Sequence, residues 1–253
     1  MPESDARVTY PPLNTCKPVA DGVWIVDGPA IRFGMPWPKL PFPTRMTVIR
    51  LGSGDLFVHS PTPLTPALRA EIEKAGNVRF LIAPNRFHYW WLPDWKQAFP
   101  EAEAYLGPRV REQAKSRIVF DAQRLEAASG YPWDDEIATL SIPGKSVSEV
   151  VFFHRPSRTL VLTDLIVNFE PGKASWLFLR MLSWVGGIAP PHGGISRDLR
   201  ANYTRHHKGE LRAAAETMLE WNPERIVFAH GRWFPDHGAD ELRRAFAWLL
   251  RAD

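Results

Sequence analysis

The sequence has very little cysteine: Cys16 is the only one, so no disulfide can form within the chain. Disulfides are rare in reducing compartments, and a lone thiol is typical of an intracellular protein. The first twelve residues are polar and contain no apolar core of a secretory signal peptide. We therefore expect a cytoplasmic protein. No recognisable base lies beside Cys16 in the sequence, which argues against a catalytic thiol.

The chain also lacks a tract of one charge. Its 31 basic and 28 acidic residues give a net charge of +3, and no Lys/Arg cluster forms. A nucleic-acid partner would need clustered positive charge, so we predict none. The longest apolar stretch, residues 174–189, is interrupted by Arg180 and two glycines. Since a bilayer span needs about 20 apolar residues, we predict no integral membrane segment. This stretch instead predicts a buried or pocket-covering helix over residues 176–184, with a membrane-surface or homodimer contact as the alternative.

Two motifs of common enzyme classes are missing. The sequence contains neither a glycine-rich phosphate loop nor a Gly-x-Ser-x-Gly nucleophile elbow. It also contains no internal repeat and no flexible linker. With 253 residues and 45% hydrophobic content, the chain can bury one large core. We predict a single domain over residues 1–253, with an N-terminal extension at 1–20 and a helical insertion or lid at 169–207.

Alternating apolar runs and capping residues predict how the chain is organised. Thr65 and Pro66 are typical of a helix start, and Gly76 of a helix end. The predicted strands cover residues 22–26, 45–50, 56–58, 78–82, 103–106, 137–142, 149–153, 159–163 and 225–229. The predicted helices cover residues 66–75, 94–99, 108–115, 208–221 and 239–250, and the proline-rich residues 36–43 predict a surface loop. Interleaved strands and helices indicate a layered α/β sandwich.

Several segments between about residues 21 and 250 resemble the metallo-β-lactamase superfamily, in the same order. Gly-Val-Trp-Ile-Val (22–26) resembles its opening strand, and Leu-Phe-Val-His-Ser-Pro (56–61) stands where that superfamily has a strand ending in Asp-Thr-Gly. Residues 83–93, which read Ala-Pro-Asn-Arg-Phe-His-Tyr-Trp-Trp-Leu-Pro, stand where it has His-x-His-x-Asp-His. Pro-Gly-Lys-Ser (143–146), Leu-Thr-Asp-Leu (162–165) and Phe-Ala-His-Gly (228–231) resemble Pro-Gly-His-Thr, Thr-Gly-Asp-Leu and the late Gly-His-Gly. The resemblance implies a four-layer αββα sandwich of the metallo-β-lactamase type.

Only part of the superfamily's metal site is retained. The resemblance assigns His88, Asp164 and His230 as metal ligands and predicts that they converge. The other ligand positions are occupied by Ala83, Asn85, Phe87 and Lys145. This set excludes the usual dinuclear centre and defines a divergent branch.

Two functions remain open. In the first, two imidazoles and one carboxylate bind one divalent ion (Zn, Fe or Mn), and a metal-bound water attacks an ester, lactone or thioester. In the second, no metal is bound and the chain is a module for a small ligand or a protein partner. The hydrolase would act on a small-molecule substrate. The metal-free module would bind a small-molecule ligand or, as a further alternative, a protein.

Lys145 bears directly on this choice. If the turn lies as in the superfamily, the Lys145 ammonium occupies the first metal position and forms a salt bridge with Asp164. Charges about 4 Å apart attract by about 4 kcal/mol at an effective dielectric constant near 20. The same attraction counts against a divalent ion beside a protonated lysine, so Lys145 is either a structural substitute for the metal or a tuned acid/base group. In the second case Lys145 and Asp164 are the predicted catalytic residues. His192 on a glycine-rich loop and an aromatic wall at Tyr89–Trp91 are secondary candidates for the pocket.

Overall fold

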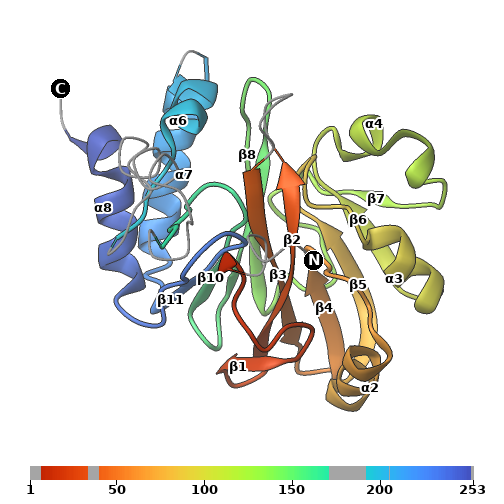
Figure 1. The fold of residues 1–253 in the computed structure, drawn as a ribbon. Coiled ribbons are helices and arrows are strands. Elements are labelled where there is room, and N and C mark those ends of the chain that lie inside the picture. Colours follow the sequence, from red (N-terminus) through yellow and green to blue (C-terminus); the bar gives the residue numbers. More distant parts are fainter. Residues whose placement is uncertain (1–6, 34–39, 171–191, 205, 252–253) are drawn as a thin grey trace.

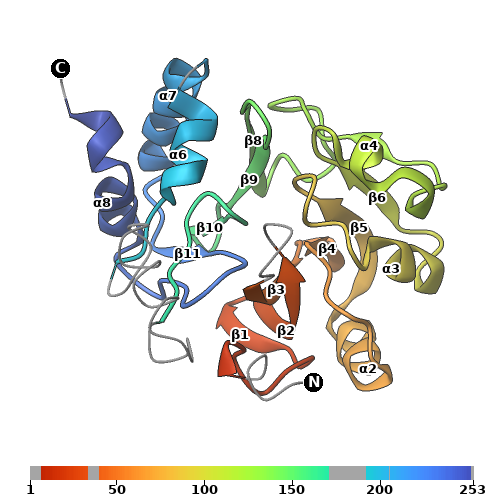
Figure 2. The ribbon, with the colours of Figure 1, turned by 45° about the horizontal axis from the view of Figure 1, so that its top comes forward.

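The computed structural model describes residues 7–33, 40–170, 192–204 and 206–251. Two β-sheets pack face to face, and helices cover both outer faces, as Figures 1 and 2 show. The predicted four-layer αββα architecture is confirmed.

The first sheet has seven strands in the order β1 to β7. Neighbours from β1 to β4 are antiparallel, and from β4 to β7 they are parallel. Parallel neighbours need crossover connections, and α2, α3 and α4 provide them on one outer face. The strands are β1 (Lys17–Ala20), β2 (Val23–Phe33), β3 (Leu40–Arg50), β4 (Asp55–His59), β5 (Asn77–Ala83), β6 (Glu103–Leu106) and β7 (Gln123–Arg124). The helices are α2 (Pro66–Ala75), α3 (Leu92–Ala98) and α4 (Val110–Ala114), which a 3₁₀ turn, Lys115–Arg117, extends.

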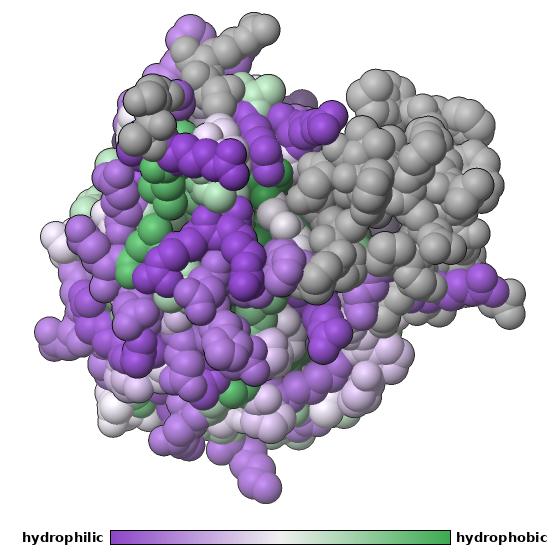
Figure 3. Space-filling view, turned by 90° about the vertical axis from the view of Figure 1, so that its left-hand side faces the viewer, coloured by the Kyte–Doolittle hydropathy of each residue, from purple (hydrophilic) through white to green (hydrophobic). Residues whose placement is uncertain are grey.

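The second sheet has four strands in the order β11-β10-β9-β8, with β10 and β11 parallel. Its strands are β8 (Ile137–Ile142), β9 (Glu149–His154), β10 (Thr159–Val161) and β11 (Arg225–Val227). Helices α6 (Arg197–Thr204), α7 (Lys208–Glu220) and α8 (Gly238–Leu250) cover its outer face. Figure 3 shows this side of the molecule, where the described surface is mainly hydrophilic. The apolar residues of these helices pack inward against the sheet.

The start and end of α2 follow from its sequence. The Thr65 hydroxyl accepts a hydrogen bond from the Leu68 amide at 3.2 Å, and Pro66 is the first helical residue. At the other end, the Gly76 amide donates to the Ile72 carbonyl at 3.1 Å. Leu68 and Ile72 are fully buried against the sheet. The capping prediction for this helix is confirmed.

Aromatic side chains fill the space between the two sheets. Trp133, which precedes β8, contacts Phe57 with ring centroids 4.9 Å apart, and Phe57 contacts Phe152 at 5.1 Å. The Trp133 indole donates to the Thr139 hydroxyl at 3.0 Å, so its buried N–H is paired. Such aromatic pairs contribute about 0.5–1.5 kcal/mol each beyond the area they bury.

The structure corrects one prediction of local structure, and another falls outside the described residues. The loop predicted at 36–43 is wrong for residues 40–43, which are the first residues of β3 and pair with β2. Pro43 lies where the register shifts between Gly28 and Ile31 and has no partner there, whereas Pro41 pairs with Arg32. The helix predicted at 176–184 lies outside the described residues. Within the described residues, no helix has the length and apolar character to cross a bilayer.

Candidate metal centre

His88, Asp164 and His230 meet at one edge of the sandwich. His88 follows β5 of the first sheet, whereas Asp164 and His230 follow β10 and β11 of the second. Asp164 Oδ1 lies 3.3 Å from His88 Nε2 and 3.1 Å from His230 Nε2, and the three ligand atoms all lie within 4.8 Å of one another. The predicted convergence of these side chains is confirmed. The Asp164 side chain is 20% exposed, so the cluster is reachable from solvent.

The orientation of His230 is set by its other ring nitrogen. Nδ1 lies 2.7 Å from the carbonyl oxygen of Pro43, in β3. A carbonyl oxygen only accepts hydrogen bonds, so Nδ1 carries a proton and donates. In a neutral ring, Nε2 then presents its lone pair to Asp164. A buried N–H···O=C bond of this kind is typical of metal-binding histidines.

His88 has an equivalent partner. Its Nδ1 lies 2.8 Å from the hydroxyl of Ser60, which directly follows β4. When Ser60 accepts from Nδ1, the Nε2 lone pair of His88 also faces Asp164. Three acceptor atoms that face one another repel unless a proton or a metal ion lies among them. A proton on one imidazole or a metal ion bound by all three side chains would relieve this repulsion.

Asn85 holds the carboxylate of Asp164 in place. Its side-chain nitrogen donates to Asp164 Oδ2 at 2.8 Å and to the Thr163 hydroxyl at 2.9 Å. Its side-chain oxygen accepts from the backbone amides of Phe87 at 2.8 Å and His88 at 3.2 Å. Asn85 is fully buried. The sequence resemblance assigned this position to a lost metal ligand, and in the structure its side chain fixes both Asp164 and the backbone at His88.

Glu149 holds the backbone at Asp164, a role that was not predicted from the sequence. This fully buried carboxylate accepts hydrogen bonds from the amides of Thr163, Asp164 and Leu165 at 2.6, 3.0 and 2.9 Å. Burial, and then the negative charge of Asp164, raise the pKa of Glu149 to about 8, although the amide hydrogen bonds oppose the shift. The available signal was an acidic residue at the start of an otherwise apolar strand.

The charge state of Asp164 suits a metal ligand. Burial alone raises the pKa of this carboxyl, but the charges and hydrogen bonds of His88 and His230 outweigh burial and hold the pKa well below its usual range. Asp164 is therefore ionised at neutral pH, which is the form that binds metal.

The structure contradicts the predicted salt bridge between Lys145 and Asp164. Lys145 is exposed, and among the described residues the charged partners of Asp164 are the two histidines. The turn at 143–148 is held by α6 instead. Asn202 accepts from the amides of Ser146 at 2.7 Å and Val147 at 3.1 Å, and its carbonyl accepts from the Lys145 amide. The turn is thus fixed by its docking on α6, and Lys145 is exposed and forms no salt bridge with Asp164.

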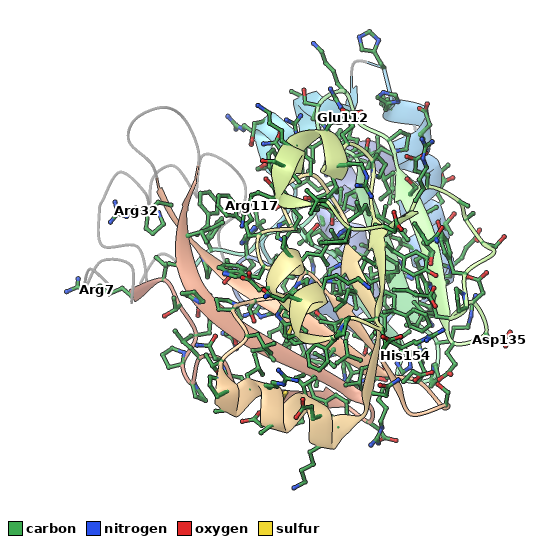
Figure 4. All side chains as sticks on the ribbon, turned by 90° about the vertical axis from the view of Figure 1, so that its right-hand side faces the viewer. Arg7, Arg32, Glu112, Arg117, Asp135 and His154 are labelled. Atoms are coloured by element: carbon green, nitrogen blue, oxygen red, sulfur yellow. The ribbon has the colours of Figure 1, made fainter. Side chains whose placement is uncertain are left out.

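Other candidates also lie elsewhere. His192 is exposed and contacts Glu241 of α8 at 3.1 Å, on the helical side of the molecule. Tyr89 and Trp91 pack into the core under α3 and α4, whereas Trp90 is partly exposed and lies beneath the Arg117 guanidinium. Figure 4 labels Arg117. These contacts contradict the predicted aromatic wall at 89–91.

Two phenylalanines line the centre instead. The Phe42 ring meets His230 edge-on with centroids 5.6 Å apart, and the Phe169 ring stacks on His230 at 6.5 Å. Phe42 comes from β3, and Phe169 from the segment after Asp164. They give the His230 side of the site an apolar border.

Solved structures with the same fold identify the class. The chain is similar to a metallo-β-lactamase from Hirschia baltica, with a TM-score of 0.60, 14% identity, and coverage of 94% of this chain and 98% of that one. It is similar to the metallo-β-lactamase FIM-1 from Pseudomonas aeruginosa in its mono-zinc form, with a TM-score of 0.59, 12% identity, and coverage of 94% and 96%. A metal-soaked Flv1 flavodiiron core from Synechocystis sp. PCC6803 matches with a TM-score of 0.60 and 10% identity, over 93% of this chain and 60% of that one. The chain thus has the metallo-β-lactamase fold, with a sequence that has diverged far from these enzymes.

The sequence itself matches one family. Residues 35–177 fit the model of a family described as Domain of unknown function (DUF4336), and the chain belongs to this family. No curated protein matches the sequence.

The donor set fits one metal ion. Ligand atoms about 2.0–2.1 Å from a tetrahedral metal ion lie about 3.3 Å from one another. The two separations from Asp164 Oδ1, 3.3 and 3.1 Å, are close to this value. Both imidazoles also have their Nδ1 atoms engaged, as metal ligands require.

Proposed function

We propose that the chain is a mononuclear metal-dependent hydrolase of an ester, lactone or thioester, in which His88, Asp164 and His230 bind one divalent ion. The observation that carries the proposal is the hydrogen bond from His230 Nδ1 to the Pro43 carbonyl. When the ring is neutral, this bond directs the Nε2 lone pair at Asp164, and a metal ion or a proton between the two atoms would relieve their repulsion. Two imidazoles and one carboxylate suit zinc and iron, with manganese as a further candidate.

The residues of the chain have separate roles in this proposal. A bound divalent ion would supply a water of lowered pKa and polarise a carbonyl oxygen. Asp164 contributes the negative charge, and Asn85 and Glu149 keep it in place. Phe42 and Phe169 exclude water from one side of His230 and favour an apolar portion of the substrate. The lone cysteine supports a cytoplasmic location for this activity.

The competing function is a metal-free module that binds a small ligand or a protein. The Asn85 amide favours it, because a neutral donor already satisfies Asp164 Oδ2 where the fold's relatives have a ligand position. A proton on His230 would then serve as the cation.

Metal content separates the two functions. The protein, purified without a histidine tag, is loaded with zinc, iron or manganese, desalted and analysed for metal. We expect about one ion per chain in the wild type and almost none in Asp164→Asn or His230→Gln. His192→Gln is the matched control, since it removes an exposed histidine that contacts Glu241 and not Asp164, and it should retain the ion. A wild-type protein that takes up no ion would establish the metal-free module. Hydrolysis of ester, thioester and lactone probes by the loaded protein then defines the substrate.

A further inference from the structure

A buried ion pair lies beneath the candidate centre. Arg45 of β3 and Asp27 of β2 face each other across the sheet, with Nε and Nη2 of Arg45 at 2.9 and 2.8 Å from Asp27 Oδ1. The other Asp27 oxygen accepts from Lys17 Nζ at 2.7 Å. Both Arg45 and Asp27 are almost completely buried. A buried pair of this kind often adds little stability compared with apolar residues of the same volume, so its other contacts are informative.

Arg45 also reaches across to the other sheet. Its Nη1 donates to the carbonyl oxygens of Phe228 and Gly231, both at 2.8 Å. These two carbonyls lie on either side of His230 in the sequence. Two residues before Arg45, the Pro43 carbonyl accepts from the His230 ring. One strand of the first sheet thus holds both the backbone and the imidazole of a ligand that belongs to the second sheet.

The loop that carries His230 also packs closely against Asn168. Gly231 has a φ of +99°, and a Cβ at this position would lie 2.1 Å from the Asn168 carbonyl oxygen. The Asn168 amide also donates to the His230 carbonyl at 3.3 Å. The His230 loop therefore lies between Asn168 on one side and the Arg45 guanidinium on the other.

We infer that Arg45, held by Asp27, is a positioning residue for His230 and determines the metal affinity of the centre. The inference rests on the proposed function, since it assigns an outer partner to one of the proposed ligands. A planar guanidinium can bond Asp27 and two carbonyls at once, because its donors point in fixed directions. A lysine ammonium at the end of a flexible chain cannot reproduce that set.

The test compares Arg45→Lys, Arg45→Met and a matched control, Arg225→Met. Arg225 lies at the start of β11, the strand that leads to His230, and its guanidinium bonds the Ser157 carbonyl at 3.0 Å. The control removes an arginine–carbonyl bond at the far end of the same strand. Zinc affinity is measured by competition with a chelating indicator. Loss of an outer partner typically weakens metal binding 10–100-fold, so we expect about tenfold weaker zinc binding in both Arg45 variants and no change in the control.

A second measurement does not depend on metal. In metal-free protein, ¹⁵N NMR of the imidazoles should show His230 with its proton on Nδ1 in the wild type and the control, and a mixture of tautomers in the Arg45 variants. General destabilisation lowers the unfolding temperature but does not alter this signature in folded molecules. If Arg45→Met does not fold, Arg45→Lys carries the test.

The outcomes are separable. A wild type that binds none of zinc, iron and manganese refutes the proposed function, and the tautomer of His230 still decides the role of Arg45. Unchanged zinc affinity together with an unchanged His230 tautomer in Arg45→Lys would overturn the inference.

Discussion

Asn85→Asp is the most informative single change, because it replaces the amide that contacts Asp164 with a carboxylate of the same shape. In the wild type, the Asn85 nitrogen lies 2.8 Å from Asp164 Oδ2. The variant places two carboxylate oxygens at this distance and removes a hydrogen bond to a charged group. A new carboxylate at this position also resembles a metal ligand. The metal-free variant should therefore be much less stable than the wild type, and a divalent ion should restore part of the loss.

The folded variant can either keep both carboxylates charged or protonate one of them, and the lower of the two free-energy costs sets the loss of stability. Two unit charges 2.8 Å apart repel by about 6 kcal/mol at an effective dielectric constant near 20. Protonating one carboxyl with an ordinary pKa of about 3.9 costs about 4 kcal/mol near pH 7, so the folded variant takes up a proton. The folded state then binds more protons than the unfolded state, and the stability of the variant relative to the wild type decreases as pH rises. The penalty should be about 4 kcal/mol near pH 7 and about 2 kcal/mol near pH 5.5.

Urea unfolding followed by tryptophan fluorescence measures this penalty at both pH values, with a chelator and with excess zinc. Asn85→Ala is the uncharged control: it also loses the bonds to Asp164 and Thr163, and in addition those from the Phe87 and His88 amides, but it adds no charge, so its penalty should be nearly independent of pH in this range. A penalty in Asn85→Asp below about 1 kcal/mol, or one equal at both pH values, would refute the electrostatic reasoning. Stability that zinc does not restore would count against an ion beside Asp164.

Two further changes test other parts of the site. His59 is almost fully buried, and burial followed by the charge of His88 lowers its pKa to about 3. Its imidazole stays neutral in the folded state but takes up a proton in the unfolded state below about pH 6.5, so it destabilises the fold as the pH falls from there toward 3. His59→Phe should reduce the loss of unfolding free energy over this range by about 1.4 kcal/mol per pH unit. Equal slopes of unfolding free energy against pH in the wild type and the variant would contradict this. Lys145 is exposed, and Lys145→Ala should change zinc affinity by less than about threefold in an indicator titration because solvent screens an exposed charge; a tenfold change would show that its ammonium reaches the centre.

The succession of strands and helices could be predicted because it depends on local patterns. Apolar alternation marks the longer strands, and Thr65, Pro66 and Gly76 mark the ends of α2. The elements that the sequence analysis missed have weak local signals. Strand β7 is only Gln123–Arg124, both exposed, and β1, Lys17–Ala20, is four residues long with no fully buried side chain.

The residues of the candidate site also differ in whether a local sequence pattern predicts their position. His88, Asp164 and His230 could be placed together because each follows a predicted strand within a recognisable motif. The position of Lys145 depends on a non-local contact, the docking of its turn on Asn202 of α6, which no local motif encodes. The roles of Asn85, Glu149 and Arg45 depend on distances across the two sheets, and residue type alone does not give them.

The division of the three ligands between the two sheets has a consequence for how the protein assembles. Asp164 lies 76 residues after His88 along the chain, and the two belong to different sheets. Contacts between segments so far apart in sequence carry a large loop-closure entropy, so we expect this cluster to form late in folding. An ion would then not yet be bound in the transition state for folding, so its binding energy would change the unfolding rate and not the folding rate. Bound metal should therefore slow unfolding while leaving the refolding rate nearly unchanged, so the ion would prolong the lifetime of the folded protein without speeding its formation.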